Sequence, residues 1–302
     1  MYRHERYRAT LRSPIEFNGV GIHSGKPVRM RVCPLYSDGG IVFKRTDVKQ
    51  GEQLIELSPE SVVDPVLCTR VVNGDGVSVA VVEHLLAAFR ICRITDAMVE
   101  IDGEEVPGMD GSAAVFVNKF NDTGLKYRNS KVPVIAVARP IVVRSGNGEL
   151  SISPSKKFSV SVELQYERVR AVVGKHNSHS FSFDDDLSNI AAARTFGWLD
   201  DYHQIRARGF ALGSSEENTI VIFEDGAIMN AGGLRHEKEI VMHKCLDLIG
   251  DLSVLGCDIL GSIKAVNPSH ALNNLLITEI TKNFRAPENE EVTSPSAVCS
   301  YL

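Results

Sequence analysis

The chain has few of the features that mark secreted, membrane-spanning or zinc-finger proteins. Its 302 residues include six cysteines and one tryptophan, and the cysteines are scattered without a CxxC spacing. Such cysteines predict reduced, mostly buried thiols in a cytoplasmic protein and argue against a structural zinc finger. No apolar run reaches the roughly 18 residues that span a bilayer, and no apolar segment follows the charged N-terminus. We therefore expect no transmembrane segment and no secretory signal.

An excess of positive charge is also absent. The chain has 33 Lys and Arg residues against 38 Asp and Glu residues, a net charge of −5 and a pI of about 6.0. Without a basic footprint, a nucleic-acid partner is not expected. The composition, 43% hydrophobic and 24% charged, is that of an ordinary globular protein, and the length suggests about two domains. We expect a monomer.

Residue patterns predict strands and helices in alternation. In the first half we expect strands at 13–17, 28–33, 41–43 and 97–101 and helices over 78–92 and 113–121. In the second half we expect strands at 134–143, 150–154, 158–164 and 259–266 and helices over 237–255 and 270–283. Ser78 is the expected N-cap of the first helix. The polar tail beyond Pro287 is expected to be loosely held.

A polar and basic segment, residues 123–132, is the best candidate linker. It divides the chain into domains at 1–126 and 127–302. A helix, a short turn and a strand follow one another at 84–99 and again at 247–261. This repeated order favours a duplicated two-layer α/β unit and thus an α+β fold.

Glu83 and His84 lie side by side in an otherwise apolar run. Apolar residues flank the pair at 79–82 and 85–89, which predicts a helix buried nearly all round. Burying an ionised side chain without a partner is costly or shifts its pKa until it is neutral. The pair therefore needs a partner, and a metal ion with a reactive water would use both residues. A lone buried ion pair or a solvent-facing edge is the alternative, and the dipeptide alone does not decide.

The helix expected at 237–255 carries a second polar group. His243, Asp247 and Asp251 are four residues apart and fall on one face, away from an apolar stripe, and Lys244 borders that face. Side chains four apart lie within about 6 Å of each other, so His243 and Asp247 can hold one cation. The alternative is that these charged residues form the solvent-facing side of an amphipathic helix.

The two helices together predict a metal centre. If the halves pack helix against helix, His84, His243 and Asp247 supply three nitrogen and oxygen ligands. Three protein ligands plus water is the arrangement of a catalytic zinc site rather than a closed structural one. Glu83, next to a ligand, is then placed to take a proton from the zinc-bound water.

Two other segments carry candidate residues. His270 stands at an expected helix start, where the helix dipole lowers the pKa of an imidazole. A capping or surface histidine is the alternative interpretation. Thr195 lies in the segment Arg194-Thr195-Phe196-Gly197-Trp198. Taken alone, this segment could be a helix end with packed aromatic residues.

The chain resembles the zinc-dependent UDP-3-O-acyl-N-acetylglucosamine deacetylases of lipid A biosynthesis over nearly its whole length. The matching strings are GVGIHSG at 19–25, VEHL at 82–85, MDGSA at 109–113, ARTFG at 193–197, HKCLDLIGD at 243–251 and HALNN at 270–274. Any one string could arise by chance. All six in the family's order, on a chain of the family's length, are highly specific.

The resemblance implies two similar two-layer α/β sandwich domains (β-α-α-β) with the active site between their helices. It implies hydrolysis of the N-acetyl group of UDP-3-O-(3-hydroxyacyl)-N-acetylglucosamine with release of acetate, the committed step of lipid A biosynthesis. His84, His243 and Asp247 would ligate Zn²⁺, with Fe²⁺ as the alternative metal in the cell. Glu83 would be the general base.

The resemblance also assigns the acid side of the site. Thr195 and the metal would stabilise the tetrahedral oxyanion. A protonated His270 would assist and would protonate the leaving amine, and Asp251 would orient His270.

Substrate contacts follow by the same analogy. Phe196 would contact the sugar, Lys244 would lie near the sugar and diphosphate, and Tyr166 occupies the region where an aromatic ring stacks on uracil. Trp198 follows the Thr-Phe-Gly string and is a further substrate-binding candidate. A groove for the acyl chain is expected near Tyr202, Arg206 and Ala211.

Two positions depart from the family's pattern at the nucleotide end. Asn267 stands where a lysine is usual, and Ser269 replaces the glycine before His270. Lys264 is a candidate substitute for the missing lysine. These departures leave open a diverged paralogue that deacetylates another acylated or nucleotide-linked amino sugar. A third hypothesis is a non-catalytic binding protein with the same fold. The intact set of buried ionisable residues argues against it.

Overall fold

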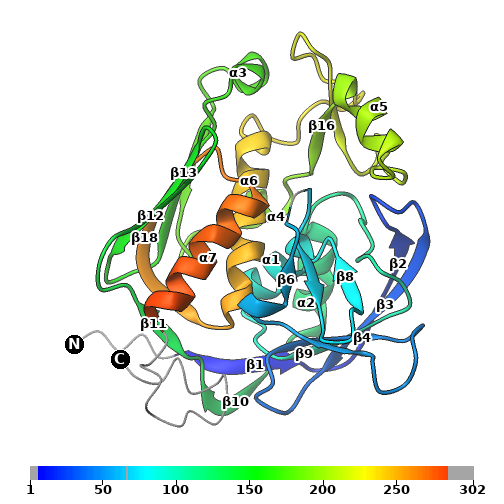
Figure 1. Cartoon of the computed structure of the whole chain (residues 1–302), viewed down its shortest axis with the longest axis vertical. Helices are drawn as coiled ribbons and strands as arrows, with labels where there is room; N and C mark the ends of the chain where they lie inside the picture. The colour runs from blue at the N-terminus through cyan, green and yellow to red at the C-terminus, as the bar shows by residue number, and fades with distance from the viewer. Residues whose placement is uncertain (1–5, 66, 285–302) are drawn as a thin grey trace.

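Two sheets lie on opposite sides of a central group of helices in the computed structural model of the chain, which describes residues 6–65 and 67–284 (Figure 1). The strands are β1 (Tyr7–Leu11), β2 (Ile15–Val20), β3 (Pro27–Pro34), β4 (Ile41–Arg45), β5 (Leu54–Glu56), β6 (Val62–Val63), β7 (Arg70–Val72), β8 (Ser78–Ala80), β9 (Ala97–Ile101), β10 (Leu125–Lys131), β11 (Val134–Ala136), β12 (Ile141–Ser145), β13 (Gly148–Pro154), β14 (Ser159–Glu163), β15 (Ser178–Phe181), β16 (Phe196–Trp198), β17 (Ile220–Ile222) and β18 (Asp258–Val266). The helices are α1 (Glu83–Ile91), α2 (Ala114–Thr123), α3 (Glu167–Val173), α4 (Ser188–Ala191), α5 (Leu199–Ala207), α6 (Glu239–Leu252) and α7 (His270–Phe284), with short 3₁₀ turns η1 (Pro59–Ser61) and η2 (Ser253–Leu255). The fold is therefore mixed α+β, as the sequence predicts.

The two main sheets have the same strand order. The first runs β2-β3-β9-β4-β5 and the second runs β12-β13-β18-β14-β15, with β11 beside β18. In each sheet the central strand is antiparallel to one neighbour (β3 or β13) and parallel to the other (β4 or β14). A parallel pair needs a crossover, and the helices α1 and α6 lie on the connections that lead into β9 and β18. The repeated helix–turn–strand order of the sequence thus corresponds to a repeated sheet topology.

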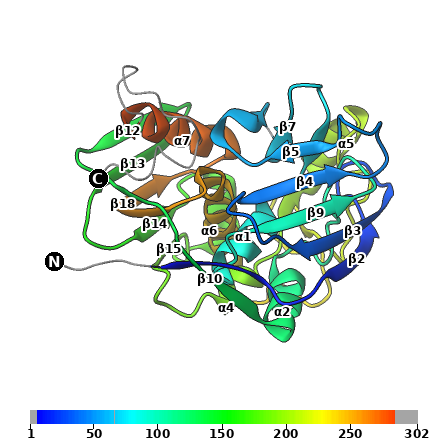
Figure 2. The same ribbon diagram turned by 90° about the horizontal axis from the view of Figure 1, so that it is seen from below.

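The helices α1 and α6 pack against each other between the sheets (Figure 2). Every residue of α1 from Glu83 to Phe89 is buried, as the apolar run predicts. Gly250 of α6 permits the close approach, because a Cβ there would lie 2.0 Å from the carbonyl oxygen of Glu83. The backbone of one helix therefore touches the first residue of the other.

The predicted start of the first helix is wrong. Ser78 is not an N-cap, because it begins strand β8, which pairs with β7. Valine at 79 favours a strand, and Val81 has a φ of +58°, which separates the strand from the helix. The helix begins at Glu83, so the Glu83–His84 pair occupies its N-terminal turn.

The predicted linker is also wrong as a local structure. Most of segment 123–132 forms strand β10, which is antiparallel to β1 from the start of the chain. Its polar pattern suits an exposed two-stranded ribbon, and its partner lies more than a hundred residues away in sequence. Local composition could not reveal this partner. The tail beyond Pro287 lies outside the described residues.

No helix in the described part of the chain combines the length and the apolar character that crossing a bilayer requires.

Candidate active site

Two histidines and one aspartate from α1 and α6 converge in the interior. His84, His243 and Asp247 are 5%, 3% and 2% exposed, and their potential ligand atoms all lie within 4.8 Å of one another. Oδ1 of Asp247 is 3.6 Å from Nε2 of His84 and 3.3 Å from Nε2 of His243. This buried oxygen has no hydrogen-bond partner among the described residues. A divalent cation would satisfy it, so the donor set fits a metal ion.

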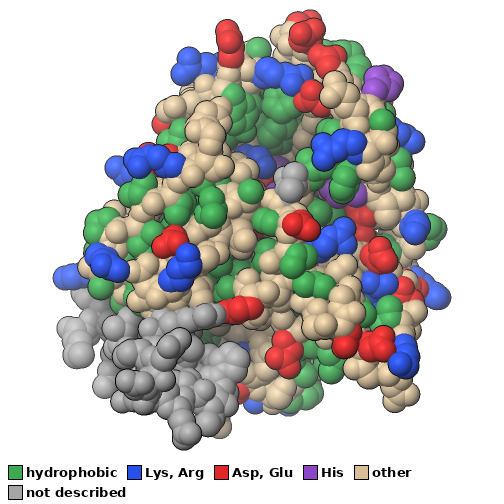
Figure 3. Space-filling model, viewed as in Figure 1, with side chains coloured by type: hydrophobic (Ala, Val, Ile, Leu, Met, Phe, Trp, Pro, Cys, Tyr) green, Lys and Arg blue, Asp and Glu red, His purple; other side chains and the backbone are tan. Residues whose placement is uncertain are grey.

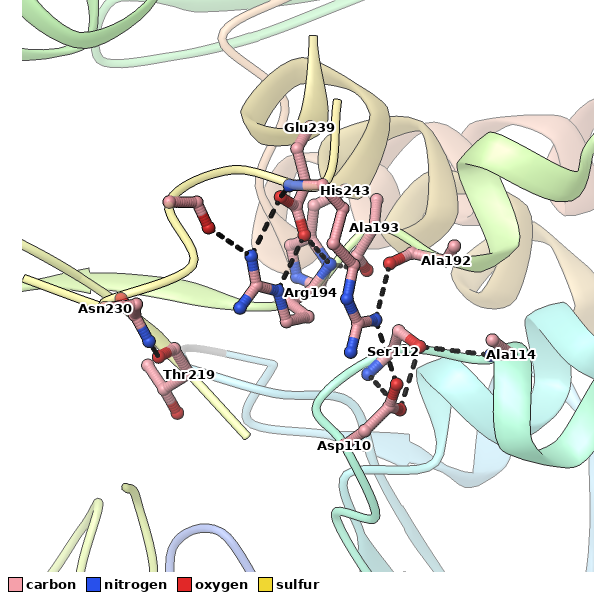
Figure 4. Close-up of polar contacts among 12 residues, drawn as sticks. Asp110, Ser112, Ala114, Ala192, Ala193, Arg194, Thr219, Asn230, Glu239 and His243 are labelled. Carbon is pink, nitrogen blue, oxygen red and sulfur yellow. Dashed lines mark hydrogen bonds and ion pairs between the residues drawn. The ribbon is translucent and has the colours of Figure 1, made fainter. Parts of the chain in front are cut away.

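The surroundings of His243 prepare it as a neutral ligand. Its Nδ1 donates to the carbonyl oxygen of Ala193 at 3.1 Å (Figure 4). This bond leaves the Nε2 lone pair facing Oδ1 of Asp247. Burial lowers the pKa of His243 to about 3. Lys244 donates to the other oxygen of Asp247 at 2.6 Å. Burial alone would raise the pKa of Asp247, but His243 and Lys244 hold this pKa well below its usual range.

Glu83 has the properties of a general base. It is buried beside His84, and burial raises its pKa. Its Oε2 accepts a hydrogen bond from the backbone N–H of Thr69 at 3.0 Å. Its Oε1 lies 3.8 Å from Nε2 of His270. A base and a potential acid therefore face each other across a short gap.

The surroundings of His270 favour its charged, imidazolium form. Its Nδ1 is 2.8 Å from Oδ2 of Asp251, which also accepts from the side-chain amide of Asn273. Burial opposes the charge, but Asp251 and Glu83 outweigh it and raise the pKa of His270 to about 9. The expectation that the helix dipole lowers this pKa is therefore wrong, because two nearby carboxylates exceed a partial dipole charge. The surface interpretation of His270 is also wrong, since the residue is buried.

The polar stripe of α6 is buried rather than solvent-facing. His243, Asp247 and Asp251 are all shielded, because α1 packs on α6 from one side and α7 from another. The solvent-facing alternative is thus excluded. Periodicity identifies a polar face but cannot tell whether another element covers it.

The predicted substrate residues line one cleft. This cleft, of about 440 Å³, is bordered by Glu83, the three metal-ligand candidates, His270 and the following predicted residues: Tyr166, Thr195, Phe196, Trp198 and Lys244. Asp251 is the one predicted site residue that does not line the cleft; it lies behind His270. Thr195 borders the cleft, and its backbone N–H donates to the carbonyl oxygen of Gly111 at 2.8 Å.

A second, more apolar cleft of about 490 Å³ adjoins the first, and both share Thr195, Phe196 and Trp198. Tyr202 and Ala211 line it as expected, whereas Arg206 does not and instead donates to the hydroxyl of Tyr202. Figure 3 shows a hollow with hydrophobic side chains between the two upper arms of the molecule, which carry α3 and α5 in Figure 1.

Asn267, one of the two departures from the family's pattern, has a structural role. Asn267 has a φ of +48°, accepts from the backbone N–H of Gln165 and donates to the carbonyl of Asn147. Its side chain therefore fastens two loops of the cleft. Lys264 is exposed and does not line the cleft, so it does not replace a lysine there.

Sequence reasoning missed Glu239. It is buried one turn before His243, and its carboxylate accepts from the backbone and guanidinium of Arg194 and from the backbone N–H of Arg235 (Figure 4). These bonds hold the segment containing Ala193 and Thr195 against α6. The four-residue spacing that joins His243, Asp247 and Asp251 extends back to Glu239 and could have revealed it.

Thr69 was missed as well, and no sequence signal marks it. It is a single threonine before a three-residue strand, and its contacts come from three distant segments.

Comparison with known proteins assigns the chain to a family. The sequence profile of the family described as UDP-3-O-acyl N-acetylglycosamine deacetylase matches residues 8–282. The chain belongs to this deacetylase family. Every predicted site residue lies within the matched span, and the family that the sequence motifs indicate is confirmed.

Relatives of the deacetylase family resemble the chain along most of its length. Proteins named UDP-3-O-acyl-N-acetylglucosamine deacetylase include one from Syntrophotalea carbinolica, 38% identical over 280 residues, covering 92% of this chain and 88% of the relative. One from Citrifermentans bemidjiense is 39% identical over 276 residues, covering 91% and 89%. One from Phenylobacterium zucineum is 38% identical over 273 residues, covering 90% and 92%.

Proposed function

We propose that the protein hydrolyses the N-acetyl group of UDP-3-O-(3-hydroxyacyl)-N-acetylglucosamine and releases acetate, in lipid A biosynthesis. The observation that carries this proposal is the buried set of His84, His243 and Asp247, with Glu83 beside it and His270 opposite. Membership of the deacetylase family supports the same reaction.

His84, His243 and Asp247 would hold a divalent ion, which we propose is Zn²⁺, with Fe²⁺ as the alternative in the cell. When bound, such an ion supplies a Lewis acid that polarises a carbonyl oxygen and lowers the pKa of water. Neutral His243 and ionised Asp247 are in the protonation states that ligation requires.

Three other side chains would take part in the reaction, two by transferring protons and one by donating a hydrogen bond. Glu83 takes a proton as water attacks the acetamide carbon, and a C–O bond forms. The Thr195 hydroxyl donates to the developing oxyanion. The His270 imidazolium, held by Asp251, then gives its proton to the sugar nitrogen as the C–N bond breaks. The products are acetate and the free amine.

The two adjoining clefts suit an acylated sugar nucleotide. Phe196 and Lys244 lie next to the metal-ligand candidates and would contact the sugar. Tyr166 would stack on the uracil, and Trp198, which lines both clefts, is a further substrate contact. The apolar cleft beyond Phe196 would take the acyl chain.

Acetate release by the metal-loaded protein tests the proposal. Glu83→Gln keeps the side-chain shape and removes the base, so kcat is expected to fall by about 10²- to 10⁴-fold. Glu56→Gln, at an exposed position of β5, is the matched control and should be fully active. Wild-type rates in Glu83→Gln would contradict the general-base role, and no acetate release by the wild type would contradict the proposed reaction.

We also propose that residues 1–126 and 127–302 form two similar two-layer sandwich domains. One main sheet uses strands from before residue 126 alone, and the other uses strands from after residue 127 alone. The active-site helices α1 and α6 then come from different domains. Folding studies of the separately expressed halves would test this division.

A further inference from the structure

Thr69 lies between two carboxylates of the site that come from different helices. Its backbone N–H donates to Oε2 of Glu83 at 3.0 Å, and its hydroxyl donates to Oδ1 of Asp251 at 2.6 Å. Glu83 begins α1, and Asp251 lies in the last turn of α6. Among the described residues, Thr69 alone forms hydrogen bonds with both carboxylates.

The main chain fixes Thr69 relative to the base. Its carbonyl accepts from the N–H of Val82 at 3.3 Å, and Val82 immediately precedes Glu83. With its own N–H bound to the Glu83 side chain, Thr69 is attached to the start of α1 at two points. The residue is 2% exposed, so water does not compete for these bonds.

The hydroxyl of Thr69 completes the hydrogen bonding of Asp251. Oδ2 of Asp251 faces His270 and Asn273, both on α7, whereas Oδ1 accepts from Thr69. A carboxylate bound on one oxygen only can rotate, and a buried oxygen that loses its donor moves to find another. The Thr69 hydroxyl therefore holds the plane of the carboxylate against which His270 is aligned.

We infer that Thr69 is a positioning residue that sets the spacing between Glu83 and His270. Its amide anchors the base, and its hydroxyl anchors the acid through Asp251, so one residue fixes both sides of the 3.8 Å gap between Oε1 and Nε2. This inference rests on the proposed deacetylase function. Thr69 itself is not among the residues that line the cleft.

Thr69→Val and Thr69→Ser separate the hydroxyl from the rest of the side chain. Valine keeps the shape and the backbone N–H, and we expect kcat to fall by about 10- to 100-fold with KM and bound metal unchanged. Serine keeps the hydroxyl and should restore most of kcat. Thr10→Val is the matched control, because Thr10 is fully buried and its hydroxyl accepts from Leu35 far from the site. It should lose stability without losing kcat.

A double-mutant comparison tests whether Thr69 acts through His270. In a His270→Gln background, Thr69→Val should add little further loss, because the group that Thr69 positions is gone. A full additional loss in that background would overturn the inference. So would an unchanged kcat in Thr69→Val, or a Thr69→Ser variant as impaired as the valine variant.

A readout without substrate keeps the inference separate from the proposed reaction. The downfield proton resonance of the His270 Nδ1–H, assigned by its loss in His270→Gln, should shift or broaden in Thr69→Val and persist in Thr69→Ser. This holds even if the wild type releases no acetate, which would count against the reaction alone. An unaltered resonance in Thr69→Val would reject the positioning role. If the valine variant does not fold, Thr69→Ala serves in the same measurements.

Discussion

His243 and His270 are both buried beside the same cleft, yet their pKa values move in opposite directions. Burial lowers the pKa of His243 to about 3, while that of His270 rises to about 9. One difference is the partner of each Nδ1, which is a neutral carbonyl at Ala193 for His243 and the carboxylate of Asp251 for His270. A second is Glu83, whose Oε1 lies 3.8 Å from Nε2 of His270. Two buried imidazoles therefore differ in charge because of the groups around them: Asp251 and Glu83 favour the charged form of His270, whereas burial, His84 and Lys244 favour the neutral form of His243.

The same substitution at both histidines sharpens this comparison most. His243→Gln removes a nitrogen ligand, so we expect loss of stoichiometric divalent metal and of activity down to background. His270→Gln should keep the metal and lose about 10²- to 10⁴-fold in kcat. Metal analysis of the purified variants alongside acetate release would check both. Metal loss in His270→Gln, or metal retention in His243→Gln, would reverse the two roles.

Asp251→Asn removes the partner that distinguishes His270. The asparagine keeps the shape but not the charge, so the pKa of His270 should fall toward its usual value. We expect kcat to drop by about 10- to 100-fold, and the alkaline limb of the kcat profile to move to lower pH. The pH profile of acetate release measures this. A limb that stays in place would mean that another group titrates there.

The smallest expected effect is on the pH dependence of folding stability. The metal-free protein is used for this measurement, because the charge of a bound cation would change both pKa values. Below pH 6.5 the unfolded chain protonates His243 while the folded chain does not until about pH 3, so stability falls as the pH is lowered through this window. From pH 6.5 to about 9 the folded chain alone keeps the His270 proton, so stability falls as the pH rises.

Thermal unfolding of the metal-free protein between pH 4 and 9.5 would record both slopes, each as a change of several °C in Tm. His243→Gln should flatten the acid slope alone, and His270→Gln the alkaline slope alone. Flattening of the opposite slope by either variant would contradict the assigned shifts.

The sequence predicted most residues of the candidate site but not its enclosure. The four-residue spacing of His243 and Asp247 placed them on one helical face, and the apolar run around Glu83 predicted deep burial. The structure agrees with both predictions. The same spacing left open whether that face met solvent. The answer lies in α1 and α7, whose packing on α6 is a long-range contact.

Errors arose where a distant partner decided the local structure. Ser78 has the chemistry of an N-cap, but pairing with β7 makes it the start of a strand. The segment 123–132 has the composition of a linker, but β1 pairs with it. Thr69 carries no local signal, since its importance depends on Glu83 and Asp251 arriving from other parts of the chain.

By itself, the sequence determined which chemical groups are present, their helical spacing, the repeated helix–turn–strand order and the family. These are properties of neighbouring residues, and periodicity and motif record them directly. Only the tertiary structure decided which groups meet across α1, α6 and α7, and therefore which imidazole is neutral and which is charged. A pKa depends on the few groups within several ångströms, and folding brings those groups together from positions far apart in the chain.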